Sequence, residues 1–332
     1  MDSVGVSDVV IIPVPWAVTV APHANPAIGI EEMSVSRYAP FIDGHQQDVG
    51  MMMENEVPLK ASMLPLSPTW QGISDRLRRH MLRHFAYAQV DLVKKSLTRA
   101  LSQKIDDYAL NLNEEIKQKA RMALLDNKLV AVLGGDHSVA LGLIESLARF
   151  YNNFGILHID AHPDLHTHYL GVHYSHASIM YNVLQLPYVT RLVQVGLRHC
   201  TYQELSMISA GEGRIFPFFA TDLYRQYTQG VAWETLCQRI IALLPDTIYI
   251  SFDIDGLDAS FCPNTGTPVS GGLKLDELLY LLEQIVVTGK RIIGFDLCEV
   301  APGKGTDWDA TIGSIVLYSL ASAMQRSTPQ RP

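Results

Sequence analysis

The chain has 332 residues, of which 48% are hydrophobic and 18% are charged, and its formal net charge is −8. These values predict a globular protein with a large core, and the negative charge disfavours nucleic acid or an anionic membrane as a partner, because both attract basic surfaces. No apolar run reaches the length of a membrane span, so we expect no membrane association.

The N-terminal third of the chain predicts one strand, a long irregular stretch and two helices. Val9–Val14 is a short apolar, β-branched run of the kind that forms buried strands. Residues 22–66 are rich in Pro, Met and Gly and lack periodicity, so we expect an irregular segment that serves function or an interface. Ser67 and Pro68 are typical of a helix start, and amphipathic patterns predict helices at about 70–104 and 108–127.

From residue 128 onward, strand and helix patterns alternate. Strands are expected at 129–133, 155–159, 191–195, 214–216, 247–252 and 291–295. Helices are expected up to about 151 and at 176–186, 201–210, 231–244, 275–287 and 309–325. This alternation predicts an α/β fold with three α/β/α layers and a mainly parallel central sheet. No linker, internal repeat or low-complexity tract is evident, so we expect one domain spanning residues 1–332.

The four cysteines are widely spaced. They lie at positions 200, 237, 262 and 298, without the spacing of a metal finger or the density of a disulfide framework. The N-terminus also lacks the basic and apolar regions of a signal peptide. These features predict a reduced, cytoplasmic protein.

Three motifs of metal-ligating residue types each follow a predicted strand. They are Gly-Gly-Asp-His-Ser at 134–138, Asp-Ala-His-Pro-Asp-Leu-His at 160–166 and Ser-Phe-Asp-Ile-Asp-Gly-Leu-Asp at 251–258. Loops that leave parallel strands open onto the carboxyl edge of the sheet, so we expect the three loops to meet. Six candidate ligands would then converge: His137, Asp160, His162, Asp164, Asp253 and Asp255.

The spacing and chemistry of these side chains favour divalent cations. Residues i, i+2 and i+4 of an extended segment share a face, so Asp160, His162 and Asp164 could reach one site, and Asp253 and Asp255 repeat the step. Bare charges are costly to bury, and two divalent ions would remove that cost. Mixed oxygen and nitrogen ligands suit Mn, Fe, Ni or Zn. Each motif alone could be a turn, a helix cap or a hydrogen-bonded strand end, but the three together disfavour that interpretation.

These motifs resemble those of the ureohydrolase family, which holds arginases, agmatinases and other guanidino-group hydrolases. The resemblance covers about residues 128–320 and includes Gly-Thr-Pro-Val-Ser-Gly-Gly at 266–272 and Asp-Leu-Cys-Glu-Val-Ala-Pro at 296–302, whereas the first 120 residues match loosely. It implies an arginase-like fold and two divalent ions, Mn²⁺ or Ni²⁺. It also implies that the six candidate ligands hold both ions, with Asp160 and Asp253 as bridges.

The resemblance implies further roles around the ions. Asp164 would orient the hydroxide that attacks the guanidino carbon. Glu299 would pair with the substrate guanidinium. His176 would carry protons, a role that suits histidine, with His166 and His173 as alternatives.

Several positions depart from the family pattern or have a simpler interpretation. His166 stands where arginases that resemble this chain have an asparagine that contacts the substrate, so it is a candidate substrate-binding residue. Residues 197–201 replace a stretch where arginases hold aspartates for the α-amino group, which argues against L-arginine. Ala177 follows His176 where the family usually has glycine. We expect a hydrogen-bonded core position for His158 and a supporting role for Asp258.

We therefore expect a binuclear metal-dependent hydrolase that releases urea or a substituted urea and an amine from a small guanidino substrate. Its site would be agmatinase-like, or would suit small or alkylated guanidines or biguanides, rather than L-arginine. The alternative is a non-catalytic partner subunit of a hetero-oligomeric ureohydrolase, although none of the expected ligands is lost. The resemblance also implies a homo- or hetero-oligomer, either a trimer or a hexamer.

Overall fold

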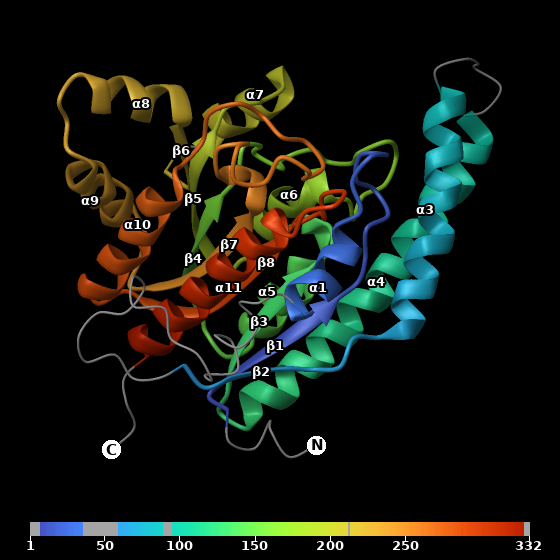
Figure 1. Ribbon diagram of the computed structural model, residues 1–332, viewed down its shortest axis with the longest axis horizontal. Coiled ribbons are helices and arrows are strands. Elements are labelled where there is room, and N and C mark those ends of the chain that lie inside the picture. The colour runs from blue at the N-terminus through green and yellow to red at the C-terminus, as the bar shows by residue number, and fades with distance from the viewer. Residues whose placement is uncertain (1–6, 36–58, 89–94, 212, 329–332) are drawn as a thin grey trace.

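The computed structural model describes residues 7–35, 59–88, 95–211 and 213–328 (Figure 1). Its centre is an eight-stranded sheet in the order β2-β1-β3-β8-β7-β4-β5-β6, and every neighbouring pair is parallel. The strands are β1 (Val9–Val14), β2 (Ala61–Met63), β3 (Leu129–Gly134), β4 (Phe154–Ile159), β5 (Val189–Leu197), β6 (Ile215–Phe219), β7 (Thr247–Asp253) and β8 (Arg291–Cys298). The predicted parallel α/β architecture is confirmed.

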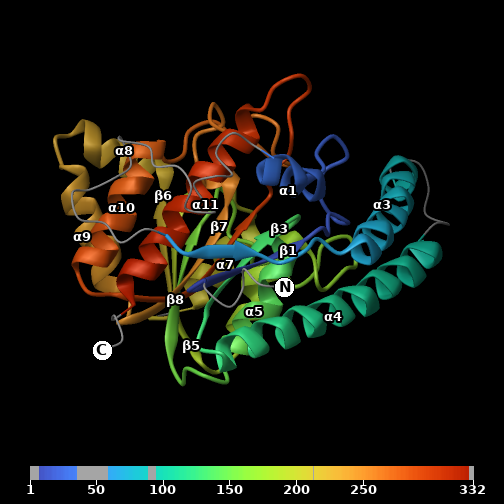
Figure 2. The same ribbon diagram turned by 60° about the horizontal axis from the view of Figure 1, so that its bottom comes forward.

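Helices cover both faces of the sheet. They are α1 (Pro26–Val35), α3 (Pro68–Ala88), α4 (Lys95–Leu125), α5 (Ala140–Leu147), α6 (Ile179–Leu184), α7 (Tyr202–Ala210), α8 (Ala220–Thr228), α9 (Trp233–Leu243), α10 (Leu275–Val287) and α11 (Trp308–Ser327). Figures 1 and 2 show α3 and α4 on one side of the molecule and α8, α9 and α10 on the other. Within the described ranges, no helix is both long and apolar enough to cross a membrane.

Alternating side chains of the strands build two apolar cores. In β3, Ala131 and Leu133 belong to the core beneath α9, α10 and α11, whereas Val130 and Val132 belong to the core beneath α4 and α5. This division follows from the two-residue period of a strand, which sends successive side chains to opposite faces. The burial of apolar groups on both faces explains why the strands read as continuous apolar runs.

Two predictions about the elements were wrong, and one helix was missed. The stretch 22–66 was expected to be irregular, but it contains α1 and β2; residues 36–58 lie outside the described part of the chain. The helix break expected near 104–108 falls inside α4, where Ile105, Ala109 and Leu112 are buried at helical spacing. Helix α8 was not predicted, because its side chains are mostly polar and Leu223 is its one buried residue.

The sheet order places the motif loops beside one another. Strands β3, β8, β7 and β4 are consecutive neighbours in the sheet. The motifs at 134–138, 296–302, 251–258 and 160–166 lie at the carboxyl ends of these strands, in that order. Because all four strands are parallel, their carboxyl ends share one edge, and the polar residues there lie within reach of one another.

The loop between β1 and α1 is attached to α3 at the same edge. Arg78 of α3 is buried and donates hydrogen bonds to four carbonyls of this loop, at 2.9 Å to Ala17, 3.0 Å to Ala21, 3.4 Å to Pro22 and at short range to Ala24. Ser74 Oγ, one turn earlier in α3, accepts the Ala17 N–H at 2.9 Å. These contacts anchor a loop that has little regular structure of its own.

We expect Arg78→Met to lower the free energy of unfolding by about 2–4 kcal/mol, because buried carbonyls would lose a charged donor without gaining access to water. Chemical denaturation of the full chain measures the change. Arg79→Met is the matched control, since Arg79 is exposed on the same helix and should change stability by less than about 0.5 kcal/mol. Equal stability of the two variants would contradict this role for Arg78.

Candidate metal centre

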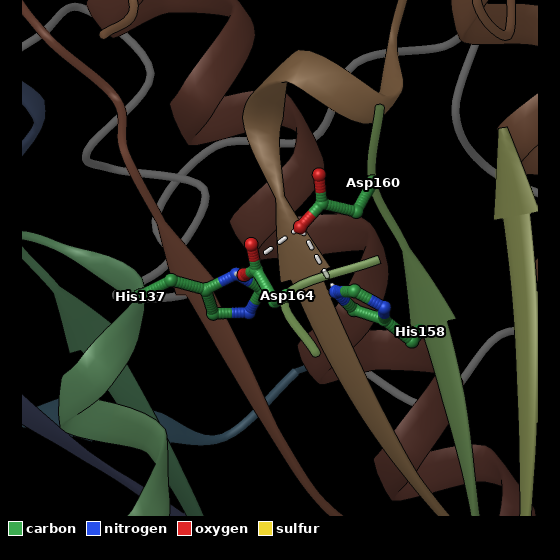
Figure 3. Close-up of side chains that lie close together, drawn as sticks. All are labelled: His137, His158, Asp160 and Asp164. Carbon is green, nitrogen blue, oxygen red and sulfur yellow. Dashed lines mark hydrogen bonds and ion pairs between the residues drawn. The ribbon is translucent and has the colours of Figure 1, made fainter. Parts of the chain in front are cut away.

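The predicted motif loops meet at the carboxyl edge of the sheet. Figure 3 shows His137, Asp164 and His158 turned toward the carboxylate of Asp160. His137 opens a short 3-10 turn directly after β3, and the Asp136 carboxylate caps this turn by accepting the Ser138 N–H at 3.2 Å. Asp160 follows the last residue of β4. The strand ends therefore place these groups, and the cap directs the histidine inward.

The first group of candidate ligands surrounds Nδ1 of His137. Carboxylate oxygens of Asp164, Asp160 and Asp253 lie 3.1, 3.3 and 3.5 Å from this nitrogen. His137 is fully buried, yet Nδ1 makes no hydrogen bond within the described part of the chain. A buried imidazole nitrogen that faces three carboxylate oxygens without bonding to any of them has the arrangement of ligands around a shared cation.

The second group adjoins the first through Asp160. His162 Nδ1 lies 3.2 Å from Oδ2 of Asp255 and 3.4 Å from Oδ1 of Asp160. The other oxygen of Asp160, Oδ2, belongs to the group around His137. Asp253 faces the first group through its Oδ2, while its Oδ1 accepts the Asp255 N–H at 3.0 Å and so holds the turn that carries Asp255. Six mixed oxygen and nitrogen donors in two adjoining groups fit two divalent cations.

The pKa values of these side chains are shifted in directions that a nearby positive charge would relieve. Burial and the neighbouring Asp160 carboxylate raise the pKa of Asp164 to about 8. Burial, together with the charges of Asp255 and Asp160, raises the pKa of Asp253 well above its usual value. Burial lowers the pKa of His162, but the Asp255 and Asp160 carboxylates outweigh it and bring that pKa to about 12. The carboxylates therefore compete for protons in the absence of a cation.

Side chains of β7 and β8 contact Nε2 of His137, the ring nitrogen that faces away from the three carboxylates. Its Nε2 lies 2.9 Å from Ser251 Oγ, which in turn donates to Asp296 Oδ2 at 3.2 Å. Asp296 Oδ2 also lies 3.4 Å from Nε2. Hydrogen bonding at one ring nitrogen fixes the tautomer and the direction of the other. Sequence reasoning missed this role, although both residues lie within the quoted motifs at strand ends.

His158 was not among the six candidates, although its ring lies close enough to His137, Asp160 and Asp164 to count with the first group. Asp258, by contrast, is in neither group among the described residues. His158 is buried in β4, where its Nε2 lies 2.9 Å from Asp160 Oδ2 and its Nδ1 lies 2.9 Å from Nε2 of Gln194. It therefore orients Asp160 from within the core. Asp258 accepts the N–H groups of Ser260 and Gly271 at 3.0 and 3.2 Å, which holds the third loop together.

Glu299 lies at the end of β8 with one free carboxylate oxygen. Its Oε1 accepts the His137 N–H at 3.3 Å, while its Oε2 is buried and lacks a hydrogen-bond partner among the described residues. Burial and the charge of Asp253 raise the pKa of this carboxyl well above its usual value. Glu299 and Asp164 adopt φ values of 64° and 52°, a left-handed region that side chains other than glycine rarely occupy. Backbone strain of this kind is concentrated at functional sites.

The candidate proton carriers have different surroundings. The ring of His176 lies 2.8 Å, through Nδ1, from Thr19 Oγ1, and burial and the charges of His162 and His137 lower its pKa to about 3. His173, by contrast, is paired through Nδ1 with Asp106 of α4 at 3.0 Å. His166 Nε2 lies 3.6 Å from Glu204 Oε2 at the start of α7. Its ring therefore faces α7, which forms the side wall of the candidate site.

Comparisons with known proteins agree with this architecture. A model of the arginase family matches residues 7–322. The chain is 33% identical over 205 residues to an N(1)-aminopropylagmatine ureohydrolase of Thermus thermophilus, covering 62% of this chain and 66% of that protein. It is 32% identical over 212 residues to an agmatinase of Neisseria meningitidis, covering 62% and 63%. The chain thus aligns with less than two thirds of the length of these relatives.

The fold has a counterpart among solved structures. The agmatine ureohydrolase of Thermoplasma volcanium superposes with a TM-score of 0.69 at 15% sequence identity, covering 97% of this chain and 92% of that one. This likeness extends through the N-terminal third, where the sequence motifs are weakest. The match of the family model from residue 7 to residue 322, together with the fold, shows that this protein belongs to the arginase family.

Proposed function

We propose that this protein is a binuclear metal-dependent hydrolase that cleaves a guanidino compound to urea or a substituted urea and an amine. The observation that carries the proposal is the pair of carboxylate–imidazole groups, one buried and one partly exposed at His162, that share Asp160 and lie beside the unpaired carboxylate oxygen of Glu299. Two divalent ions, Mn²⁺ or Ni²⁺, would supply a nucleophile from water at neutral pH. The ligands would be His137, Asp160, His162, Asp164, Asp253 and Asp255, with Asp160 and Asp253 shared.

Glu299 is proposed to bind and orient the substrate guanidinium. Its free oxygen needs a donor, and a guanidinium offers several in a planar array. A Cβ placed on Gly266 would lie 3.4 Å from Oε2 and 3.9 Å from Val20 Cβ, so the glycine leaves space beside the carboxylate. The other oxygen is held by the His137 N–H, which keeps the carboxylate beside the metal ligands.

Asp164 and His176 are proposed to handle water and protons. Asp164 is a buried carboxylate beside His137, so it can accept a hydrogen bond from the attacking water and orient it. His176, on the loop that follows the 160–166 motif, is a part-buried imidazole held by Thr19, so we propose that its ring relays a proton to the leaving amine.

Residues 198–201 support a substrate other than L-arginine. Arg198 donates to main-chain carbonyls of Asp255, Leu257 and Val269 at 2.7, 3.0 and 2.8 Å, so its guanidinium is already engaged. Thr201 forms a reciprocal cap with Glu204 at the start of α7. Neither residue is free to bind the charged amino-acid end of arginine. Agmatine, an aminopropylated agmatine, or a small or alkylated guanidine or biguanide fits better, with His166 on the side wall as a substrate contact.

The alternative proposal is a partner subunit that binds metal without turning over substrate. The presence of all six candidate ligands in two coherent groups argues against it. We further propose a cytoplasmic location and assembly into a homo- or hetero-oligomer, as a trimer or hexamer.

A screen of urea and amine release tests the proposed function. The purified full chain is loaded with Mn²⁺ or Ni²⁺ and assayed with arginine, agmatine, aminopropylagmatine, guanidinobutyrate, guanidine and dimethylbiguanide. We expect about two ions per chain and faster turnover of a substrate that lacks the α-amino acid group than of arginine. Uptake of two ions without release from any substrate would favour the partner-subunit alternative. Uptake of a single ion would contradict the binuclear centre.

We expect His176→Gln to keep both ions and lower kcat by about 100-fold, because general acid–base catalysis typically contributes at least that factor. Metal analysis and steady-state kinetics measure the two effects. His173→Gln is the matched control, since His173 is exposed and paired with Asp106, and it should turn over at close to the wild-type rate. Full turnover in His176→Gln would assign the proton carrier to His166 or His173.

A further inference from the structure

Thr19 links the N-terminal loop to the proposed proton carrier. It lies between β1 and α1, is 1% exposed, and is 157 residues away from His176 in the sequence. Its Oγ1 lies 2.8 Å from His176 Nδ1 and accepts the His176 backbone N–H at 3.2 Å. The same hydroxyl donates to Asp136 Oδ2 at 3.4 Å. One buried hydroxyl therefore touches the ring, the backbone and a carboxylate.

The hydrogen-bonding capacity of the hydroxyl limits the state of the ring. A threonine hydroxyl has one proton to donate and two lone pairs to accept with. Both carboxylate oxygens of Asp136 act as acceptors, since Oδ2 accepts the Val18 N–H at 3.1 Å and Oδ1 accepts the Ser138 N–H at 3.2 Å, so the Thr19 proton is directed to Oδ2. One lone pair accepts the backbone N–H of His176. The remaining lone pair faces Nδ1, which must then carry the ring proton.

The loop that carries Thr19 is held in place from two sides. Arg78 and Ser74 of α3 bind the main chain of Ala17 on one side. On the other side, Asp136 Oδ2 accepts the Val18 N–H at 3.1 Å, and the Asp136 N–H donates to the Trp16 carbonyl at 2.6 Å. The hydroxyl of Thr19 is therefore directed by well-anchored backbone on either side.

The opposite edge of the His176 ring is free to react. Within the part of the chain that the structure describes, its Nε2 has no hydrogen-bond partner. The ring of Tyr169 packs against the imidazole edge-on, with centroids 5.0 Å apart and planes at 70°. The orientation of the ring is thus set by Thr19 and Tyr169, and Nε2 is left to exchange protons.

We propose that Thr19 is a positioning residue that holds His176 in the tautomer protonated on Nδ1, so that Nε2 presents its lone pair to the reaction. This inference rests on the proposed hydrolase function, and it adds a residue from the segment in which the sequence resembles ureohydrolases least. Thr19 acts through His176 and does not touch the substrate.

The test compares Thr19→Val, which removes the hydroxyl at constant shape, with Thr19→Ser, which retains it. In the metal-loaded full chain, we expect Thr19→Val to lower kcat by about 10- to 100-fold with KM and metal content unchanged, and Thr19→Ser to stay within about 3-fold of wild type. A merely structural role for Thr19 would instead lower the melting temperature and metal content along with kcat. Equal losses of kcat in the two variants would also overturn the proposal.

A readout that does not depend on turnover separates this proposal from the function itself. Nitrogen-15 NMR of histidine-labelled protein loaded with diamagnetic Zn²⁺, with His176 assigned by means of His176→Gln, reports which ring nitrogen carries the proton. We expect the proton on Nδ1 in wild type and Thr19→Ser, and loss of this preference in Thr19→Val. A proton on Nε2 in the wild type would overturn the proposal. If no guanidine is hydrolysed but the NMR result holds, the proposed function fails while the positioning of His176 stands.

Discussion

Asp160→Ala should remove most of the bound metal and nearly all hydrolytic activity in one step. Its two carboxylate oxygens serve different groups of ligands, with Oδ2 3.3 Å from His137 Nδ1 and Oδ1 3.4 Å from His162 Nδ1. The substitution therefore removes a donor from both proposed ions. We expect metal content to fall from about two ions per chain to one or fewer. Activity should fall by at least about 1000-fold, which corresponds to about 4 kcal/mol of transition-state stabilisation.

Elemental analysis and kinetics on the same dialysed sample check this prediction. Asp160→Asn guards against misfolding of the alanine variant, because it keeps the size of the side chain while removing its charge, and it should show the same losses. Asp258→Asn is the matched control: Asp258 belongs to a neighbouring motif but binds the backbone of its own loop, so both ions and most activity should remain. Full metal content in both Asp160 variants would refute the bridging role.

Glu299→Gln should lower kcat/KM by about 100- to 1000-fold while leaving both ions in place. The variant keeps the shape of the side chain but loses the negative charge that would pair with the guanidinium, which corresponds to about 3–4 kcal/mol. The backbone around it should not move, because the Glu299 N–H donates to the Gly135 carbonyl at 2.8 Å and the Glu299 carbonyl accepts the Thr265 hydroxyl at 2.9 Å.

Two controls separate binding of the guanidinium from other effects. Glu31→Gln removes an exposed charge on α1 and should leave kcat/KM unchanged. Metal analysis of Glu299→Gln should give the wild-type value, and an empty site in this variant would contradict its assignment to the substrate. Wild-type kcat/KM in Glu299→Gln would move the guanidinium contact elsewhere in the site.

The central and C-terminal parts of the fold could be predicted from the sequence because their signals are local. Each strand from β3 to β8 is a short apolar run, and the regular alternation with helices predicts a parallel sheet. The N-terminal third gave weaker signals. Helix α1 begins after Asn25 with a proline in its first turn, but it lies in a stretch without clear periodicity, and α8 buries only Leu223. Short or mostly polar helices gain their stability from tertiary packing, which a local pattern does not record.

The sequence by itself determined which residues are candidate metal ligands, because all six lie in short motifs at or just after the carboxyl ends of strands that end at one edge of a sheet. Only the tertiary structure decided which atoms face one another: the sharing of Asp160 between two histidines, the support of His137 by Ser251, and the contact of Thr19 with His176. These contacts join side chains that are as much as 157 residues apart in the chain, so they leave no periodic trace in the sequence. They arise because the packing of neighbouring strands and loops fixes the direction of each side chain after the backbone has been placed.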